Sequence, residues 1–148
     1  MNLSPRGGDC LRVLGPHEIM FRDLIGSGAE TTAHLRENGR IVVMFCAFKG
    51  PPRILRCHGI GQTILPSDPQ FADFNSRFEE SSRGVRAFIH IDVKRISTSC
   101  GYGVPLYDYK EERPILDNYY NKQSAEELLQ FQKDKNQTSI DGLAAFDL

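Results

Sequence analysis

The fold is decided by Ile41-Val-Val-Met-Phe-Cys-Ala-Phe48, by the break Gly50-Pro-Pro52, and by the run from Arg53 to Leu65. The first run is continuously apolar and begins with β-branched residues, which predicts a strand covered on both faces. The second run contains Gly59 and Gly61, and glycines inside a strand are typical of a bulge or a barrel corner. The two runs are therefore predicted to pair as a long antiparallel hairpin.

Two further strands are predicted on either side of this hairpin. Residues 18–23 form a short apolar run after the turn-like Gly15-Pro16. Residues 87–94 alternate between aliphatic and mostly polar side chains, which predicts a strand with one buried face.

Helix signals separate the strands. Ser27-Gly-Ala-Glu30 has the spacing of a capping box and opens a predicted helix that Asn38-Gly39 ends. Asp68-Pro69 is a predicted start for a helix with three phenylalanines on one face, and Ser124-Ala-Glu-Glu127 repeats the capping-box pattern. Strands without regular βαβ spacing favour a small antiparallel barrel with peripheral helices.

Composition excludes several classes of function. The 148 residues carry a formal net charge of -1, so no basic field exists to hold nucleic acid. No apolar run approaches the ~20 residues of a membrane span, and the N-terminus lacks the apolar core of a signal peptide. The four cysteines and four histidines are scattered, which predicts reduced thiols in a cytoplasmic protein and no metal site.

Six short blocks occur along the chain in a characteristic order: Asn2-Leu-Ser-Pro-Arg-Gly7, Ala33-His-Leu-Arg-Glu-Asn-Gly-Arg40, Met44-Phe-Cys-Ala-Phe48, Gly50-Pro-Pro-Arg-Ile-Leu-Arg56, Thr98-Ser-Cys-Gly-Tyr-Gly-Val-Pro-Leu106 and Ser139-Ile-Asp-Gly-Leu143. Together they resemble the pyridoxamine 5′-phosphate oxidase-related, FMN-binding branch of the split-barrel flavoproteins.

The resemblance implies a mainly β, antiparallel, Greek-key-like split β-barrel that binds FMN as a homodimer. Residues 1–148 are then one domain, and residues 124–148 are its C-terminal helix and tail. Relatives of this type usually begin with a helix and a first barrel strand, so the chain is expected to be N-terminally shortened at Met1. The dimer interface is expected to use the barrel face with a helix carrying Phe71, Phe74 and Phe78, or one carrying Leu128 and Phe131.

The resemblance also implies where the flavin lies. It sets a strand over residues 2–7 against the cofactor, and Asn2, Ser4 and Arg6 are the candidate binding residues there. The glycine-rich turn before the first helix is a natural anion site, with Ser27, Gly28 and Thr31 as candidates and Glu30 as a cap. Arg53 is a further candidate cation. From the residues alone, Arg6 fits a solvated position on an exposed edge strand better than a ligand site, and Arg53 fits an exposed strand end at least as well.

The predicted function is that of an FMN-dependent oxidoreductase acting on a small-molecule substrate. True pyridoxamine phosphate oxidation is not expected, because Glu30-Thr31 stands where those enzymes have an adjacent Arg-Lys pair. Two alternatives stay open, a non-enzymatic flavin or haem carrier or sensor and a cofactor-free truncated relative. No catalytic residue is assigned, because no acid–base pair or nucleophilic triad stands without the flavin.

Overall fold

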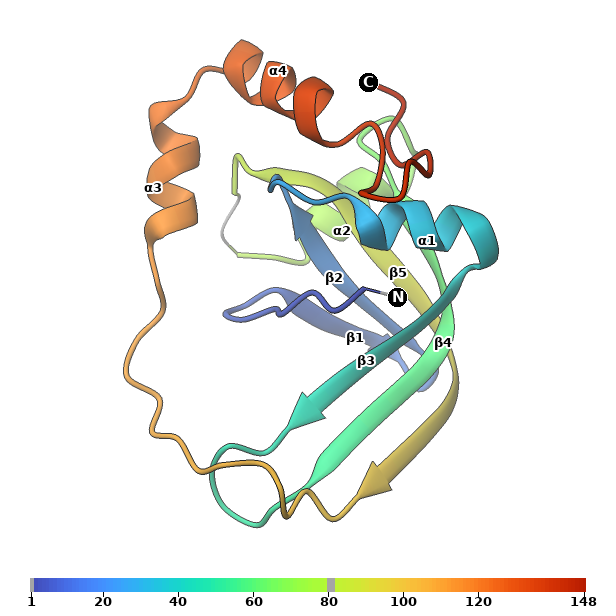
Figure 1. Ribbon diagram of the computed structural model, residues 1–148, viewed down its shortest axis with the longest axis vertical. Helices are drawn as coiled ribbons and strands as arrows, with labels where there is room; N and C mark the ends of the chain where they lie inside the picture. The colour runs from blue at the N-terminus through green and yellow to red at the C-terminus, as the bar shows by residue number, and fades with distance from the viewer. Residues whose placement is uncertain (1, 80–81) are drawn as a thin grey trace.

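The computed structural model describes residues 2–79 and 82–148, so Met1 lies outside it. Within that part of the chain, five strands form one antiparallel sheet in the order β1-β2-β5-β4-β3 (Figure 1). The strands are β1 (Leu11–Gly15), β2 (Glu18–Leu24), β3 (Arg40–Cys46), β4 (Ile54–Ile64) and β5 (Val85–Ser99). Strands β3, β4 and β5 are neighbours in sequence order and β2 returns beside β5, which is a Greek-key arrangement. The mainly β, split-barrel fold class is confirmed, although the sheet is not closed and β1 and β3 are its two edges.

Helices cluster around one end of the sheet (Figure 1). Helix α1 (Glu30–Asn38) joins β2 to β3, and Gly39 ends it in the left-handed conformation with φ 68°, as predicted. Helix α4 (Ala125–Lys135) has the predicted capping box between Ser124 and Glu127. The chain also forms α2 (Phe71–Ser76) and α3 (Ile115–Lys122). None of the helices in the described residues has the length and apolar composition to cross a membrane.

The two faces of the sheet carry separate parts of the core. One face gathers Ile19, Phe21, Ile89 and Ile91 with Leu35 of α1. On the other face the rings of Phe71, Phe74 and Phe78 surround Phe88, with centroid distances of 5.0, 6.0 and 5.8 Å. The three phenylalanines therefore pack together on one face of the sheet, but only Phe71 and Phe74 lie on α2, because the helix ends at Ser76. Asp68 is not its N-cap, because α2 begins only at Phe71 and the Asp68 carboxylate accepts a hydrogen bond from the Leu65 N–H.

The burial of β5 and β3 is the reverse of the prediction. Strand β5 was expected to be half-buried, but Phe88 and Ile89 point to opposite faces and both are 0% exposed. The α2 phenylalanines cover the second face. Strand β3 was expected to be covered on both faces, yet Val42 is 50% and Met44 48% exposed, because β3 is an edge strand.

The sheet bulges at Gly59, one of the two predicted positions, and the extra residue, Lys94, lies on β5. The register of β4 with β5 shifts between His58 and Gly59. A Cβ atom at Gly59 would lie 2.4 Å from the carbonyl oxygen of Asp92, so only glycine permits this approach of the two backbones. The end of the sheet where α1 and the C-terminal tail lie is called the closed end below. The bulge bends the long β3–β4–β5 layer away from that end (Figure 1).

Three other predictions need correction. Residues 2–7 do not form a strand; Pro5 cannot donate to a ladder, and the first strand begins only at Leu11. Helix α3 was missed because Pro114 and its polar neighbours hide the start of a short helix. Phe74, Phe78 and Leu128, expected at a dimer interface, are buried within the single chain, while a dimer through other residues stays a prediction.

Candidate functional site

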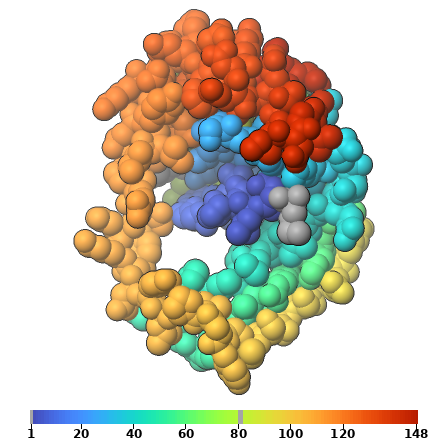
Figure 2. Space-filling model, in the orientation of Figure 1, coloured from blue at the N-terminus to red at the C-terminus, as the bar shows by residue number. Residues whose placement is uncertain are grey.

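A cavity of about 1040 Å³ lies at the closed end of the sheet. Its walls are the N-terminal segment (residues 2–10), the β2–α1 loop (residues 25–29), the first turn of α1, and the chain from residue 111 to α3. In the space-filling view, the molecule is hollowed between the blue N-terminal segment and the orange segment that leads to α3 (Figure 2). The cavity is large enough for a cofactor-sized ligand.

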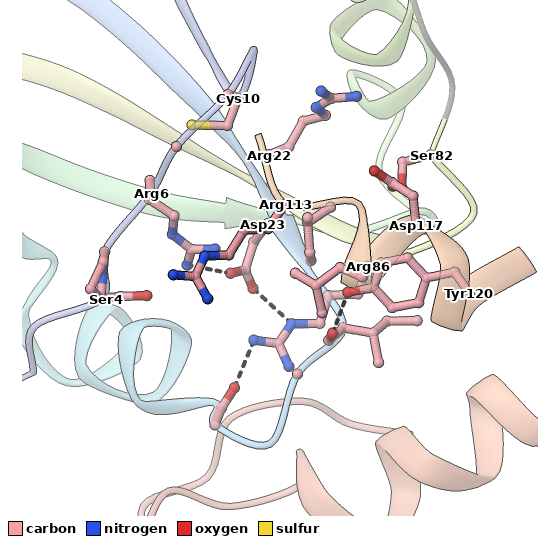
Figure 3. Close-up of a pocket in the computed structure, with 18 of the residues that line it drawn as sticks. Ser4, Arg6, Cys10, Arg22, Asp23, Ser82, Arg86, Arg113, Asp117 and Tyr120 are labelled. Atoms are coloured by element: carbon pink, nitrogen blue, oxygen red, sulfur yellow. Dashed lines mark hydrogen bonds and ion pairs between the residues drawn. The ribbon is translucent and has the colours of Figure 1, made fainter. Parts of the chain in front are cut away.

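A chain of charges crosses the floor of this cavity (Figure 3). Asp23, at the end of β2, is 1% exposed and accepts from Arg6 Nη2 at 2.7 Å and from Arg86 Nε at 2.8 Å. A buried carboxylate needs such partners, because an unpaired charge in a protein interior is strongly destabilising. The Arg86 side chain is 5% exposed, whereas that of Arg6 is 26% exposed. Arg6 is therefore the member of the trio that a ligand in the cavity reaches.

The first turn of α1 borders the same cavity. Its N-cap position is Ala29, which provides no side-chain cap, so the first N–H groups of the helix lack that partner. Thr31 lies in this turn, and its hydroxyl accepts from Asn2 Nδ2 at 2.8 Å. Uncapped N–H groups and the positive end of the helix dipole favour an anion at this end of the cavity.

The predicted capping box before α1 is wrong. The helix begins at Glu30, so Ser27 precedes the N-cap and Glu30 occupies the first helical position instead of the third. The Glu30 carboxylate accepts from the Ile140 N–H at 3.2 Å and thereby contacts the C-terminal tail. It also lies close to Gly28, where an added Cβ would be 2.5 Å from Glu30 Oε2.

Five of the seven predicted binding residues come together in the cavity lining, namely Asn2, Ser4, Arg6, Gly28 and Thr31. Ser27 is exposed and does not line the cavity. Arg53 is exposed and lies at the opposite end of the sheet, where its carbonyl oxygen accepts from the Ala47 N–H and its backbone packs against Gly101. Arg53 does not belong to this site.

Sequence reasoning missed the buried residues behind the site, Asp23, Arg86 and Tyr120. Arg86 had a recognisable signal, because it is the one charged residue in the apolar start of β5, over residues 85–89. Tyr120 had none. Its hydroxyl donates to the Ile25 carbonyl oxygen at 2.5 Å, and burial raises its pKa to about 12, so the hydroxyl keeps its proton.

The outer wall of the cavity is charged. Arg83, Arg113, Glu112 and Asp117 are among the residues that line it. Cys10 also lines the cavity, but burial raises the pKa of its thiol, which keeps it in the unreactive protonated form. Among the residues that the structure describes, no group of three or more His, Cys, Asp or Glu side chains is placed to hold a metal ion.

Comparison with known proteins places the chain in a family. It is 39% identical, over an alignment of 159 positions that takes in 97% of the chain, to the pyridoxamine 5′-phosphate oxidase family protein ustO of Aspergillus flavus. The chain belongs to the pyridoxamine 5′-phosphate oxidase-related family. It spans 64% of the length of that relative. No protein-family model matches the chain.

The first turn of α1 begins with Glu30-Thr31, where an adjacent Arg-Lys pair is the expectation for a true pyridoxamine phosphate oxidase. Two arginines from other elements contact this region: Arg86, whose Nη2 donates to the Gly28 carbonyl oxygen at 2.7 Å, and Arg6, which pairs with Asp23. The positive charge is therefore supplied from β5 and the N-terminal segment and not from the helix.

Proposed function

We propose that this chain binds FMN in the cavity and works as a flavin-dependent oxidoreductase. The observation that carries the proposal is Arg6, a partly exposed guanidinium that buried Asp23 orients beside the uncapped first turn of α1. The whole activity of the longer relative is not assumed for this chain, because the match covers 64% of that protein.

The phosphate end of FMN fits the residues present. A phosphate needs a cation and N–H or hydroxyl donors, and Arg6, Ser4, Thr31 and the first turn of α1 supply them around one part of the lining. Gly28 also lines this part of the cavity, and without a side chain it avoids a clash with the Glu30 carboxylate. Glu30 is held by the Ile140 N–H, which keeps its carboxylate engaged with the tail.

The ring end of FMN fits less completely. An isoalloxazine ring needs a dry surface. Charged residues, which attract water, line part of the cavity, among them Arg83, Glu112 and Asp117. We therefore propose that the ring is covered by a second copy of the chain. The exposed Val42 and Met44 on edge strand β3 support a homodimer, because soluble proteins normally cover such a strand.

The roles of the residues follow from this arrangement. Bound FMN would supply the redox chemistry by accepting two electrons from a small-molecule substrate. Arg6 would bind the phosphate, Asp23 and Arg86 would orient Arg6, and Ser4 and Thr31 would donate hydrogen bonds to the phosphate or the ribityl chain. With Glu30-Thr31 in place of a basic pair, we do not propose true pyridoxamine phosphate oxidation.

The visible spectrum of protein purified from cells tests the cofactor. Two broad flavin bands support the proposal. A single sharp, intense band would indicate a haem carrier, and a colourless protein that also fails to bind added FMN would indicate a cofactor-free relative. Either of those results overturns FMN binding as the function.

Titration of variants with FMN tests the site. Losing a hydrogen bond to a charged group costs about 1.5–3 kcal/mol, so Arg6→Ala should weaken FMN binding roughly tenfold to more than a hundredfold. Arg77→Ala is the matched control, because Arg77 pairs with Asp73 on the surface outside the cavity. Glu30→Ala should leave FMN affinity unchanged or raised, since it removes a negative charge. Loss of binding in Glu30→Ala with none in Arg6→Ala would require a different phosphate site.

A further inference from the structure

The β2–α1 loop is held by an unusual set of contacts. Three of its carbonyl oxygens accept hydrogen bonds from buried side chains of other elements. Tyr120 Oη donates to Ile25 at 2.5 Å, Asn136 Nδ2 to Gly26 at 2.8 Å, and Arg86 Nη2 to Gly28 at 2.7 Å. The loop contains two glycines and would otherwise be costly to order.

The three donors come from separate parts of the chain. Arg86 lies on β5, Tyr120 on α3, and Asn136 at the C-terminal end of α4. Tyr120 and Asn136 are 1% and 0% exposed. Each donor is thus withdrawn from water and must find a protein partner, and each finds it in the same short loop.

The packing around Tyr120 fixes its direction. Gly84 lies against its ring, where an added Cβ would be 2.1 Å from the ring carbon Cε2. The carbonyl oxygen of Gly84 also accepts from the Ile25 N–H at 2.8 Å. Ile25 is therefore held on both sides of its backbone, by Gly84 at its N–H and by Tyr120 at its C=O.

The C-terminal tail reinforces the same region. The Phe146 ring lies under the Arg86 guanidinium, 4.9 Å from its centre, and the Ala145 carbonyl oxygen accepts from Arg36 of α1 at 2.8 Å. The Ile140 N–H donates to Glu30. Helices α3 and α4 and the tail thus contact the loop and α1 through side-chain hydrogen bonds at several points.

We propose that Tyr120 and Asn136 are positioning residues for the phosphate end of the cavity. They contact the loop that leads into α1, and by fixing that loop they set where the first turn of α1 stands relative to Arg6. This inference rests on the proposed FMN function. It assigns the C-terminal third of the chain a role in ligand binding in addition to its part in the core.

The test compares Tyr120→Phe with Tyr119→Phe in the full chain. The first variant removes one buried hydroxyl and keeps the ring, whereas Tyr119 is 39% exposed and its ring packs against Phe131. The affinities for FMN and for riboflavin are measured for both variants, because the two ligands differ only in the phosphate. Asn136→Leu is the second positioning variant and keeps the approximate volume.

A lost neutral hydrogen bond predicts that Tyr120→Phe lowers FMN affinity about two- to tenfold. Riboflavin affinity should not change, and Tyr119→Phe should match the unaltered chain for both ligands. Amide exchange of residues 25–30 should also be faster in Tyr120→Phe and in Asn136→Leu. An equal loss of FMN and riboflavin affinity, or unchanged exchange in the loop, would overturn the positioning role.

The same experiment separates the two proposals. If the unaltered chain binds neither FMN nor riboflavin, the proposed function is wrong. Amide exchange in the absence of ligand then decides by itself whether Tyr120 and Asn136 fix the loop.

Discussion

The first half of strand β5 and strand β3 are both mainly apolar, but their environments are opposite. Both are rich in Ile, Val and Phe, yet the first half of β5 is buried on both faces while alternate side chains of β3 are about half exposed. Strand β5 lies in the middle of the sheet with α2 against it, and β3 lies at an edge. The apolar composition of a strand therefore indicates how much apolar surface must be covered. The position of the strand in the sheet determines which element covers that surface.

The two ends of the sheet also differ in the elements that they carry. The closed end joins β2, the start of β5, α1 and the C-terminal tail around the cavity. The open end carries β3 and the outer parts of β4 and β5. Several large apolar side chains are exposed on these strands, namely Val42, Met44, Ile60 and Ile96. We expect mutations at the closed end to change the stability of the chain, and mutations at the open end to change its association.

Phe88→Ala should have the largest effect. Truncating a fully buried phenylalanine typically costs about 3–5 kcal/mol, and Phe88 is surrounded by three aromatic rings. Met44→Ala on β3 should cost less than about 1 kcal/mol in the dissociated chain, because the side chain is half exposed. Urea unfolding at low protein concentration measures both. Equal losses would remove the distinction between the two strands.

The double variant Val42→Asp, Met44→Asp should weaken self-association by at least about tenfold, or about 1.4 kcal/mol. Two carboxylates on an apolar edge strand would have to be desolvated at an interface. Sedimentation over a range of concentrations measures the change. Val13→Asp on the other edge strand, β1, is the control, since Val13 is also exposed. A chain that is monomeric before mutation would contradict the proposed homodimer.

Ser124→Ala should cost about 1 kcal/mol of unfolding free energy, the typical value of an N-cap. The Ser124 hydroxyl accepts from the Glu127 N–H at 3.1 Å, and Glu127 Oε2 accepts from the Ser124 N–H at 2.8 Å. Thermal unfolding measures the loss. Because α4 belongs to the closed end, self-association should stay unchanged; a weaker dimer would show that the two ends are coupled.

The smallest expected effect is a pH dependence at the same cap. The hydrogen bond from the Ser124 backbone lowers the pKa of Glu127 from its ordinary 4.5. The ionised form is favoured in the folded chain, so this contribution is present above pH 4.5 and is lost as the pH falls through the lowered value. Glu127→Gln should flatten that part of the stability–pH curve. An unchanged curve would assign the acid sensitivity to other carboxylates.

The sequence was sufficient for much of the fold because the signals were local. The break at Gly50-Pro-Pro52 predicted the β3–β4 hairpin, Gly59 predicted the bulge, and Ser124 with Glu127 predicted the start of α4. Each depends on residues within a few positions of one another. The burial of β3 and β5 was predicted wrongly because it depends on the order of strands in the sheet.

Some residues of the candidate site could be predicted from local sequence, and others could not. The resemblance to a family pointed to Ser4 and Arg6, and the glycine-rich turn before α1 pointed to Thr31; all three line the cavity. Neither signal revealed Asn136, whose contact with Gly26 spans 110 positions, or Tyr120, whose contact with Ile25 spans 95. A lone Asn or Tyr in a polar helix has no pattern that sets it apart from a surface residue.

The Asp23 carboxylate pairs with two arginines, so the site tolerates the substitution of one of them. Because Arg86 also pairs with Asp23, losing Arg6 does not leave a buried charge alone. The N-terminal segment can then exchange Arg6 for a neutral or differently shaped residue while the interior keeps its charge balance. Ligand preference at this end of the cavity is thus separable from the integrity of the fold, and the segment is the natural place for relatives to diverge in what they bind.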